Sequence, residues 1–308
     1  MQRILQPGDI EALDRIEFPR VRLPRPAVLF ADRAARLRAL AAEAHPLREF
    51  LRFTALLVDV QAQAAQGVRT APVDAARVER AVANAMPVVS AAEAVDPAWR
   101  DVLRALAAAV AGDPTLPRPL RVATRELMSA PADELDRRAR AALRRDDGPR
   151  VRIDQPLVMA ALQVVFADLA SRLDERRIPF AVPATICPVC ASLPVAGVLR
   201  IGGAAGGHRY LHCGTCATEW HMVRVKCSHC ESTKGIRYRG IEGAGTVLAE
   251  TCDTCHAYLK QVDQEEDALA EPLADDLASL TLDLLMADTP YARACANPLL
   301  ALGPEDGA

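Results

Sequence analysis

Hydrophobic side chains recur with the period of an α-helix over most of the first 180 residues. The clearest case lies between Asp96-Pro97 and Gly112, where apolar side chains return every three or four residues: Trp99, Val102, Leu103, Leu106 and Val110. This spacing places them on one face of a helix. Aspartate followed by proline is a typical helix start, and glycine is a typical stop. The pattern predicts an amphipathic helix that begins at Pro97 and ends at Gly112.

Further stretches show the same periodicity. Ala31–Ala44, the region around Leu47–Val58, and Ala75–Met86 each predict an amphipathic helix. Pro156–Leu173 is apolar almost all round, which is typical of a central helix packed on several sides. Residues 1–183 are therefore expected to form a helical bundle.

A last periodic stretch, Leu269–Met286, predicts a C-terminal helix. Its stripe consists of Leu273, Leu277, Leu280 and Leu284. We expect this helix to pack against the helical bundle or against the segment that precedes it.

The composition changes near Ile178–Ala184, where Pro179 and Pro183 indicate a linker. Eight of the nine cysteines and ten of the sixteen glycines lie beyond it, before residue 256. The ninth, Cys295, has no partner in the sequence pattern and is expected to be a small buried side chain in the C-terminal tail.

The eight clustered cysteines form four C-x-x-C pairs: Cys187/Cys190, Cys213/Cys216, Cys227/Cys230 and Cys252/Cys255. The pairs are separated by 22, 10 and 21 residues, so the first two and the last two repeat one pattern. About twenty residues suffice for a hairpin that returns the second pair to the first. The 10-residue gap is the bridge between two modules.

Each module carries the four thiolates of a tetrahedral metal site. The spacing predicts that Cys187, Cys190, Cys213 and Cys216 hold one ion, and that Cys227, Cys230, Cys252 and Cys255 hold a second. An interleaved arrangement is less favoured, because each repeat is complete in itself. Since four cysteines complete a tetrahedron, the five nearby histidines are expected to lie outside the ligand set: His208, His212, His221, His229 and His256.

The overall charge argues against two other classes of function, nucleic-acid binding and binding to an anionic membrane. Lys and Arg number 37 against 40 Asp and Glu, a formal charge of −3, so no overall field attracts nucleic acid or an anionic membrane. The segment 184–260 has a net charge of +3, from eight basic and five acidic residues. An arginine-rich stretch (Arg137, Arg138, Arg140, Arg144, Arg145, Arg150, Arg152) is interleaved with acidic residues, which favours a solvated helix face with ion pairs.

The longest uncharged apolar stretch, Gln155–Ala167, is too short to span a bilayer, and the first residues do not resemble a secretory or twin-arginine signal. We therefore expect a soluble, cytosolic protein. Cys252-Asp-Thr-Cys255-His256 matches the c-type haem attachment pattern, but an unexported chain makes haem an unfavoured alternative. The sequence contains no P-loop, dinucleotide-binding glycine motif or G-x-S-x-G motif, and we expect no enzymatic activity.

The cysteine segment resembles the FdhE-type formate dehydrogenase accessory proteins. The resemblance rests on Cys213-Gly-Thr-Cys216 through Trp220, Arg224 and Lys226 to Cys227-Ser-His-Cys230, and on Cys187-Pro-Val-Cys190. It extends over Tyr258-Leu-Lys-Gln-Val-Asp, Pro272-Leu-Ala-Asp-Asp-Leu and the stretch from Pro24 to Leu40. In one respect the chain departs from rubredoxin-type knuckles, which usually place a glycine after each pair: Ala191, Ala217, Glu231 and His256 stand there.

The resemblance implies an α+β protein, with an all-helical N-terminal bundle, two tandem rubredoxin-like (zinc-ribbon-like) metal modules and a C-terminal helix. We predict a helical domain at 1–183, modules at 184–225 and 226–262, and a C-terminal helix and tail at 263–308. The resemblance also implies two iron ions, with zinc as the alternative because both metals accept four thiolates. It implies a cytoplasmic accessory protein that binds the catalytic subunit of a respiratory formate dehydrogenase.

The partner surface is expected to include Trp220 and Arg224 near the bridge, and Arg237 and Arg239 after the third pair, because tryptophan and arginine are enriched in interface hot spots. Two alternatives remain open: a zinc-ribbon module that binds nucleic acid, and a rubredoxin-like electron carrier.

Overall fold

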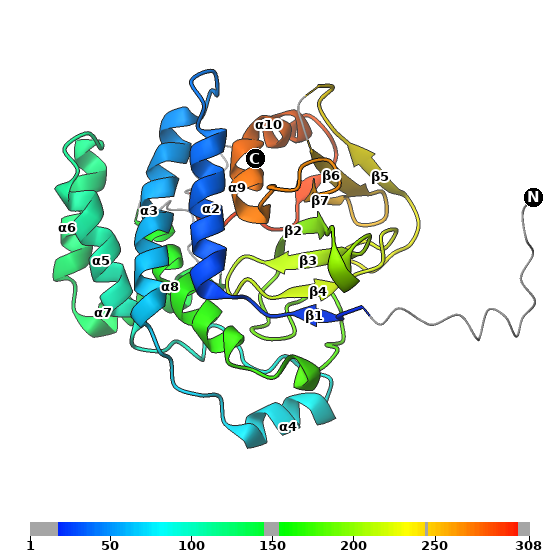
Figure 1. Cartoon of the computed structure of the whole chain (residues 1–308), viewed down its shortest axis with the longest axis horizontal. Helices are drawn as coiled ribbons and strands as arrows, with labels where there is room; N and C mark the ends of the chain where they lie inside the picture. Colours follow the sequence, from blue (N-terminus) through cyan, green and yellow to red (C-terminus); the bar gives the residue numbers. More distant parts are fainter. Residues whose placement is uncertain (1–17, 145–153, 244–245, 301–308) are drawn as a thin grey trace, which may run out of the picture.

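The computed structural model describes residues 18–144, 154–243 and 246–300. It has an α+β architecture in which a group of helices lies beside a mixed sheet (Figure 1). The N-terminal helices are α2 (Pro26–Leu40), α3 (Arg48–Gly67), α4 (Ala75–Ala83), α5 (Trp99–Gly112), α6 (Arg118–Ser129), α7 (Ala132–Arg144) and α8 (Gln155–Ser171). A short 3-10 helix, Glu175–Arg177, follows them, and a second one lies at Gly203–Ala205.

Helix α8 is the centre of the helical layer. Every residue from Pro156 to Ala170 is buried, and the helix contacts α3, α5 and α7 along its length. The prediction of a central helix packed on several sides is therefore confirmed. A helix that is apolar all round can be stable only in such a position.

Helix α5 begins at Trp99 rather than at Pro97. The carboxylate of Asp96 accepts the backbone N–H of Ala98 at 2.9 Å and that of Ala71 at 3.0 Å. Asp96 therefore stabilises a turn before the helix and ties it to the loop after α3. The apolar stripe itself is as predicted, with all five side chains buried.

The sheet contains eight strands: β1 (Val21–Arg22), β2 (Pro194–Leu199), β3 (Arg209–Cys213), β4 (Glu219–His221), β5 (Ile236–Arg239), β6 (Val247–Cys252), β7 (Ala257–Asp263) and β8 (Ala292–Arg293). Their order is β1-β4-β3-β2-β7-β6-β5, and β8 also pairs with β7. Strands β2 and β3 form an antiparallel hairpin between the first two cysteine pairs. Strands β5 and β6 do the same between the last two, so both expected hairpins are confirmed.

Two pairings join parts of the chain that are far apart in sequence. Strand β2 pairs in parallel with β7, with Gly197 opposite Gln261, so the two cysteine modules share one sheet. Strand β1 pairs with β4, with Val21 opposite Trp220. The expectation that residues 1–183 are entirely helical is therefore wrong at β1, which belongs to the sheet.

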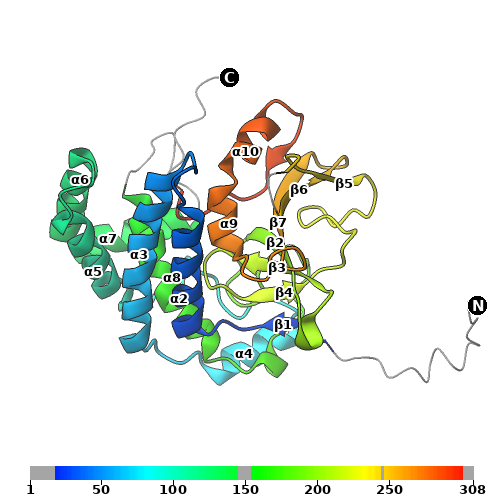
Figure 2. The ribbon, with the colours of Figure 1, turned by 45° about the horizontal axis from the view of Figure 1, so that its top comes forward.

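The C-terminal helix is divided into α9 (Pro272–Ala278) and α10 (Leu280–Ala287). Helix α9 contacts α2, β2 and β7, so it packs between the two layers (Figure 2). The break at Ser279 shifts the helical phase, and the predicted single stripe is wrong: Leu284 is 73% exposed, whereas Leu282 and Met286 are buried.

A buried lysine accounts for this break. Lys260 Nζ donates to the carbonyl oxygen of Asp276 at 2.6 Å, and the Ser279 hydroxyl donates to the carbonyl oxygen of Asp275 at 2.8 Å. These side chains satisfy carbonyl groups at the end of α9, where a helix leaves its last four carbonyls without internal partners.

The arginine-rich stretch lies partly on α7. There Arg137 pairs with Asp133 and Glu134, and Arg138 pairs with Glu134 and Asp154, as expected for a solvated face with ion pairs. Arg145, Arg150 and Arg152 lie outside the described residues. Within the described ranges, no helix has the length and hydropathy needed to cross a bilayer.

Candidate metal centres

The eight clustered cysteines come together in two groups of four, as the spacing predicts. Site 1 contains Cys187, Cys190, Cys213 and Cys216, and site 2 contains Cys227, Cys230, Cys252 and Cys255. Within each group the sulfur atoms all lie within 4.8 Å of one another. Each C-x-x-C pair forms one metal-binding knuckle. The first knuckle thus lies with the second and the third with the fourth, without interleaving.

The sulfur positions fit a four-coordinate metal ion. Across site 1, Cys187 Sγ lies 3.5 Å from Cys216 Sγ, and Cys190 Sγ lies 3.5 Å from Cys213 Sγ. The corresponding distances at site 2 are both 3.7 Å. A tetrahedron with metal–sulfur bonds of about 2.3 Å has edges of about 3.8 Å. These distances therefore suit zinc or iron bound by four thiolates.

All four knuckles share one backbone turn. The N–H of the residue after each pair donates back to the carbonyl of the first cysteine, for example Ala191 to Cys187 at 3.0 Å and Glu231 to Cys227 at 3.1 Å. This residue has a positive φ in every case: 64° at Ala191, 57° at Ala217, 60° at Glu231 and 53° at His256. The knuckle backbone is thus preserved without the usual glycine, although L-residues adopt this conformation at some cost.

Backbone N–H groups also point at the sulfurs. The N–H of Thr215 lies 3.4 Å from Cys213 Sγ, and the N–H of His229 lies 3.3 Å from Cys227 Sγ. Such bonds stabilise thiolates and help to set the potential of an iron site. Burial, and next the neighbouring cysteines, raise the pKa of the Cys187 thiol well above its ordinary value, and a cation beside it would favour the thiolate.

Site 1 lies in the interior of the molecule. Its four cysteines are at most 1% exposed and belong to the same hydrophobic cluster as α5 and α8. The backbone N–H groups of Val88, Val89 and Ala91 donate to the carbonyls of the first knuckle, at 2.8 to 3.0 Å. Site 1 therefore connects the helical layer with the sheet.

Site 2 lies at the surface. Cys227 and Cys252 are buried, whereas Cys255 is partly exposed and Cys230 is exposed. Next to Cys227 the chain exposes two apolar side chains, Val223 at 55% and Val225 at 58%. The two groups thus have matching sulfur geometry but different access to solvent.

A buried polar network lies beside site 1. Glu219 accepts hydrogen bonds from Arg22 at 2.6 Å, from Arg200 at 3.0 Å and from His212 Nδ1 at 3.1 Å. Burial alone would raise the pKa of Glu219, but the Arg200 charge and the His212 hydrogen bond outweigh it and hold the pKa well below its ordinary range. The sequence analysis did not identify this network, although His212 directly precedes the ligand Cys213.

The five histidines of the cysteine segment have different surroundings. Neither four-sulfur group includes a histidine among the residues that the structure describes. His229 and His256 are exposed, and His208 and His221 pack around Phe18. The haem alternative is not supported, because Cys252 and Cys255 face Cys227 and Cys230.

The four residues expected at a partner surface have different environments. Arg224, Arg237 and Arg239 are exposed. Trp220 is only 3% exposed, and its Nε1–H donates to the carbonyl of Ala184 at 2.8 Å. The expectation that Trp220 contributes to a partner surface is therefore wrong, because its ring fills the core between β4 and the linker.

Comparison with known proteins covers almost the entire described chain. Family models match residues 18–181 (FdhE, N-terminal), 186–224 (FdhE, central domain) and 225–300 (FdhE, C-terminal domain). The chain is 40% identical to the Protein FdhE homolog of Stutzerimonas stutzeri, over 98% of each chain. It is 37% identical to Protein FdhE of Escherichia coli, over 93% of this chain and 92% of that one.

A solved structure agrees with these matches. The crystal structure of the FdhE protein from Pseudomonas aeruginosa superposes with a TM-score of 0.80 at 35% identity, covering 92% of this chain and 100% of that chain. Similarity at this level extends through the helical layer, both cysteine groups and the C-terminal helices. The chain therefore belongs to the FdhE family.

Proposed function

We propose that this protein is an accessory factor that binds the catalytic subunit of a formate dehydrogenase and is needed for that enzyme to become active, without itself oxidising formate. The observation that carries the proposal is the match to FdhE proteins over nearly the whole length, together with two complete four-cysteine sites. The resemblance to formate dehydrogenase accessory proteins supplies the client. Contact takes place in the cytoplasm, before the client is exported.

We further propose that both sites hold iron in the cell. The donor set of four thiolates accepts ferrous or ferric iron as readily as zinc, and the resemblance favours iron. When bound, iron supplies a one-electron centre, whereas zinc supplies none. Cys187, Cys190, Cys213 and Cys216 would hold the first ion, and Cys227, Cys230, Cys252 and Cys255 the second.

The surface around site 2 is the proposed contact for the client. It carries an exposed cysteine, Cys230, and the exposed pair Val223 and Val225 with Arg224 between them. Arg237 and Arg239 lie close by on β5, the last strand of the sheet order. Exposed apolar side chains interspersed with arginine are typical of protein interfaces.

Two experiments test the proposal. The first measures complex formation between the purified protein and the purified catalytic subunit, and the second measures formate dehydrogenase activity in a deletion strain. We expect a complex with the wild-type protein and loss of formate dehydrogenase activity in the deletion strain. Arg224→Glu should weaken the complex, whereas Arg144→Glu, an exposed arginine on α7, should not. Unchanged enzyme activity in the deletion strain, together with no complex, would refute the accessory role.

A role as electron carrier is the second candidate, favoured by the exposure of Cys230 at site 2. The visible spectrum of freshly purified protein distinguishes the metals, because a ferric tetrathiolate is coloured and a zinc site is not. Reversible bleaching by a reductant would support electron transfer, and a colourless protein with two zinc ions per chain would exclude it.

A further inference from the structure

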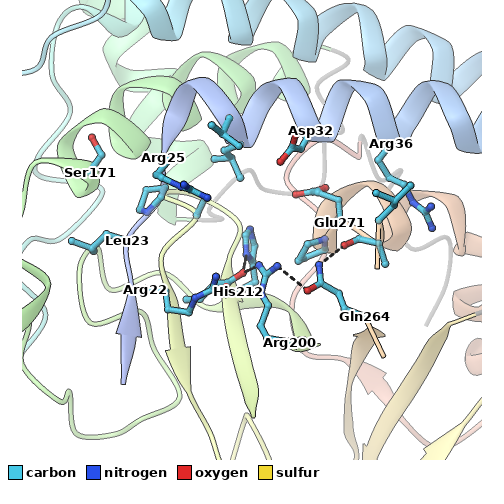
Figure 3. A pocket seen from close by; sticks show the side chains of 18 of the residues that line it. Arg22, Leu23, Arg25, Asp32, Arg36, Ser171, Arg200, His212, Gln264 and Glu271 are labelled. Carbon is cyan, nitrogen blue, oxygen red and sulfur yellow. Dashed lines mark hydrogen bonds and ion pairs between the residues drawn. The ribbon is translucent and has the colours of Figure 1, made fainter. Parts of the chain in front are cut away.

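A cavity of about 880 Å³ lies between α2 and the sheet, on the side of the molecule where the linker leaves α8 (Figure 3). Its floor is polar and buried, formed by His212, Glu219 and Glu271, which are 2%, 4% and 8% exposed. Its rim is open to solvent and mixed in character: Val28 of α2 is 44% exposed and Leu269 77% exposed, and the exposed charged side chains of Arg25, Asp32 and Glu175 also line the cavity. A concave site that combines apolar side chains with a few buried polar groups is typical of a binding site.

His212 presents an unsatisfied polar atom in the floor of the cavity. Its side chain points from β3 towards α2 (Figure 3), and Nε2 is buried without a hydrogen-bond partner in the described chain. Because Nδ1 faces the carboxylate of Glu219 at 3.1 Å, Nε2 is the ring nitrogen that is left for a ligand. A buried polar atom without a protein partner is a point at which a bound group can form a hydrogen bond.

The part of the cavity at the start of α2 favours negative charge. Helix α2 begins there with no side-chain cap among the described residues and no acidic residue in its first turn. The partial positive charge of this helix end is reinforced by Arg25 and Arg22, which line the same end. Arg22 uses one Nη to bind Glu219, which leaves further guanidinium N–H groups for a ligand.

These features suit a ligand that carries hydrogen-bonding groups, a carboxylate and apolar groups on one scaffold. We propose that the cavity binds a short extended polypeptide segment of the client protein, with an Asp or Glu side chain placed near Arg25 and the start of α2. A backbone amide group of this segment forms a hydrogen bond with His212 Nε2, and apolar side chains contact Val28 and Leu269. The proposal rests on the proposed function, since it makes this cavity a second contact with the client, separate from site 2.

The cavity also lies next to site 1. Its wall includes Ala217, which follows the ligand Cys216, and its floor includes His212, which precedes the ligand Cys213. A segment bound there therefore covers the second knuckle of site 1.

The test measures binding of fluorescent 15-residue peptides that tile the catalytic subunit, using fluorescence anisotropy with the full-length protein. We expect at least one acidic peptide to bind, and Leu269→Ser and Arg25→Glu each to weaken it by about tenfold or more. Both positions are exposed, so these variants should fold normally. The matched controls are Leu284→Ser, 73% exposed on α10, and Arg125→Glu, exposed on α6; neither should change binding.

A second measurement reports on His212 Nε2, the buried atom without a protein partner. In zinc-loaded protein labelled with 15N-histidine, the Nε2 resonance of His212 should shift when the peptide is added. No peptide binding, equal binding by the Leu269→Ser and Arg25→Glu variants, or binding of inorganic phosphate alone would each overturn the inference. If the whole catalytic subunit binds wild type and both variants equally, only the cavity inference fails; if it does not bind wild type at all, the proposed function fails.

Discussion

Arg209 on β3 and Glu250 on β6 form a fully buried ion pair that connects the two cysteine modules. Arg209 Nη2 lies 2.6 Å from Glu250 Oε1, and the two side chains are 0% and 3% exposed. Strands β2 and β7 lie between β3 and β6 in the sheet order.

The same arginine holds the bridge between the modules. Arg209 Nη1 donates to the carbonyls of Val223 at 3.2 Å and Lys226 at 2.9 Å. The Tyr238 hydroxyl donates to the second oxygen of Glu250 at 3.0 Å, and burial, followed by the Glu250 charge, raises the pKa of Tyr238 to about 12. Site 2 is thereby positioned by side chains of the first module.

Replacing Arg209 by methionine should destabilise the protein by about 3–5 kcal/mol, because it leaves Glu250 buried without its cation. The free energy of unfolding, measured in urea, checks this. Arg237→Met is the control: its ion pair with Asp253 is exposed, so little change is expected. Adding Glu250→Gln to Arg209→Met should restore part of the loss, and no restoration would contradict the assignment.

The two metal sites should respond differently to loss of a ligand. Cys190→Ser should lower soluble yield and the melting temperature of the entire protein, because site 1 lies within the helical core. Cys230→Ser should remove about half of the bound metal but leave the helical layer folded. Metal analysis and circular dichroism measure both effects.

Cys295→Ala, at a buried cysteine outside both groups, should retain two ions per chain. Equal loss of helical structure in the Cys190→Ser and Cys230→Ser variants would show that burial does not distinguish the sites.

Ala191→Gly should stabilise the protein by roughly 0.5–1 kcal/mol. The left-handed conformation costs an alanine about 1–2 kcal/mol, and the greater freedom of glycine in the unfolded chain cancels part of the gain. Ala160→Gly in α8 is the opposite case and should lose about 1 kcal/mol or more, since the residue is helical. Thermal and urea unfolding of both variants provide the comparison, and destabilisation by Ala191→Gly would show that the knuckle is not strained.

Asp276 should make stability depend on pH. It is buried beside Lys260 at 3.0 Å and Arg293 at 2.5 Å. Burial alone would raise its pKa, but the charges of Arg293 and Lys260 outweigh it and hold the pKa below its ordinary value. The stability from a lowered carboxyl pKa is present above the unfolded-state value of about 4 and is lost as the pH falls further.

Comparison of wild type with Asp276→Asn isolates this effect, because metal loss in acid is common to both proteins. The difference in unfolding free energy should be largest near pH 7 and should shrink below about pH 4. A difference that stays constant from pH 7 to pH 3 would contradict the role of Asp276.

The sequence by itself determined the local structure and the grouping of the cysteines. Helices α5 and α8 follow from the spacing of their apolar residues, since each buries a face or its entire circumference. The two groups of four sulfurs follow from the repeated C-x-x-C spacing, because a hairpin between two pairs brings them to one point. These are properties of short segments, so local pattern suffices.

Only the tertiary structure decided which segments pair with one another and which residues they cover. The parallel pairing of β2 with β7 and the recruitment of β1 join residues far apart in sequence, and no local signal encodes such a register. The packing of the helices over one module buried site 1 and Trp220 but left site 2 at the surface, although the two cysteine patterns are nearly identical. Whether a residue is exposed depends on the elements that pack over it. Here those elements are N-terminal helices, which lie far from the cysteines in sequence.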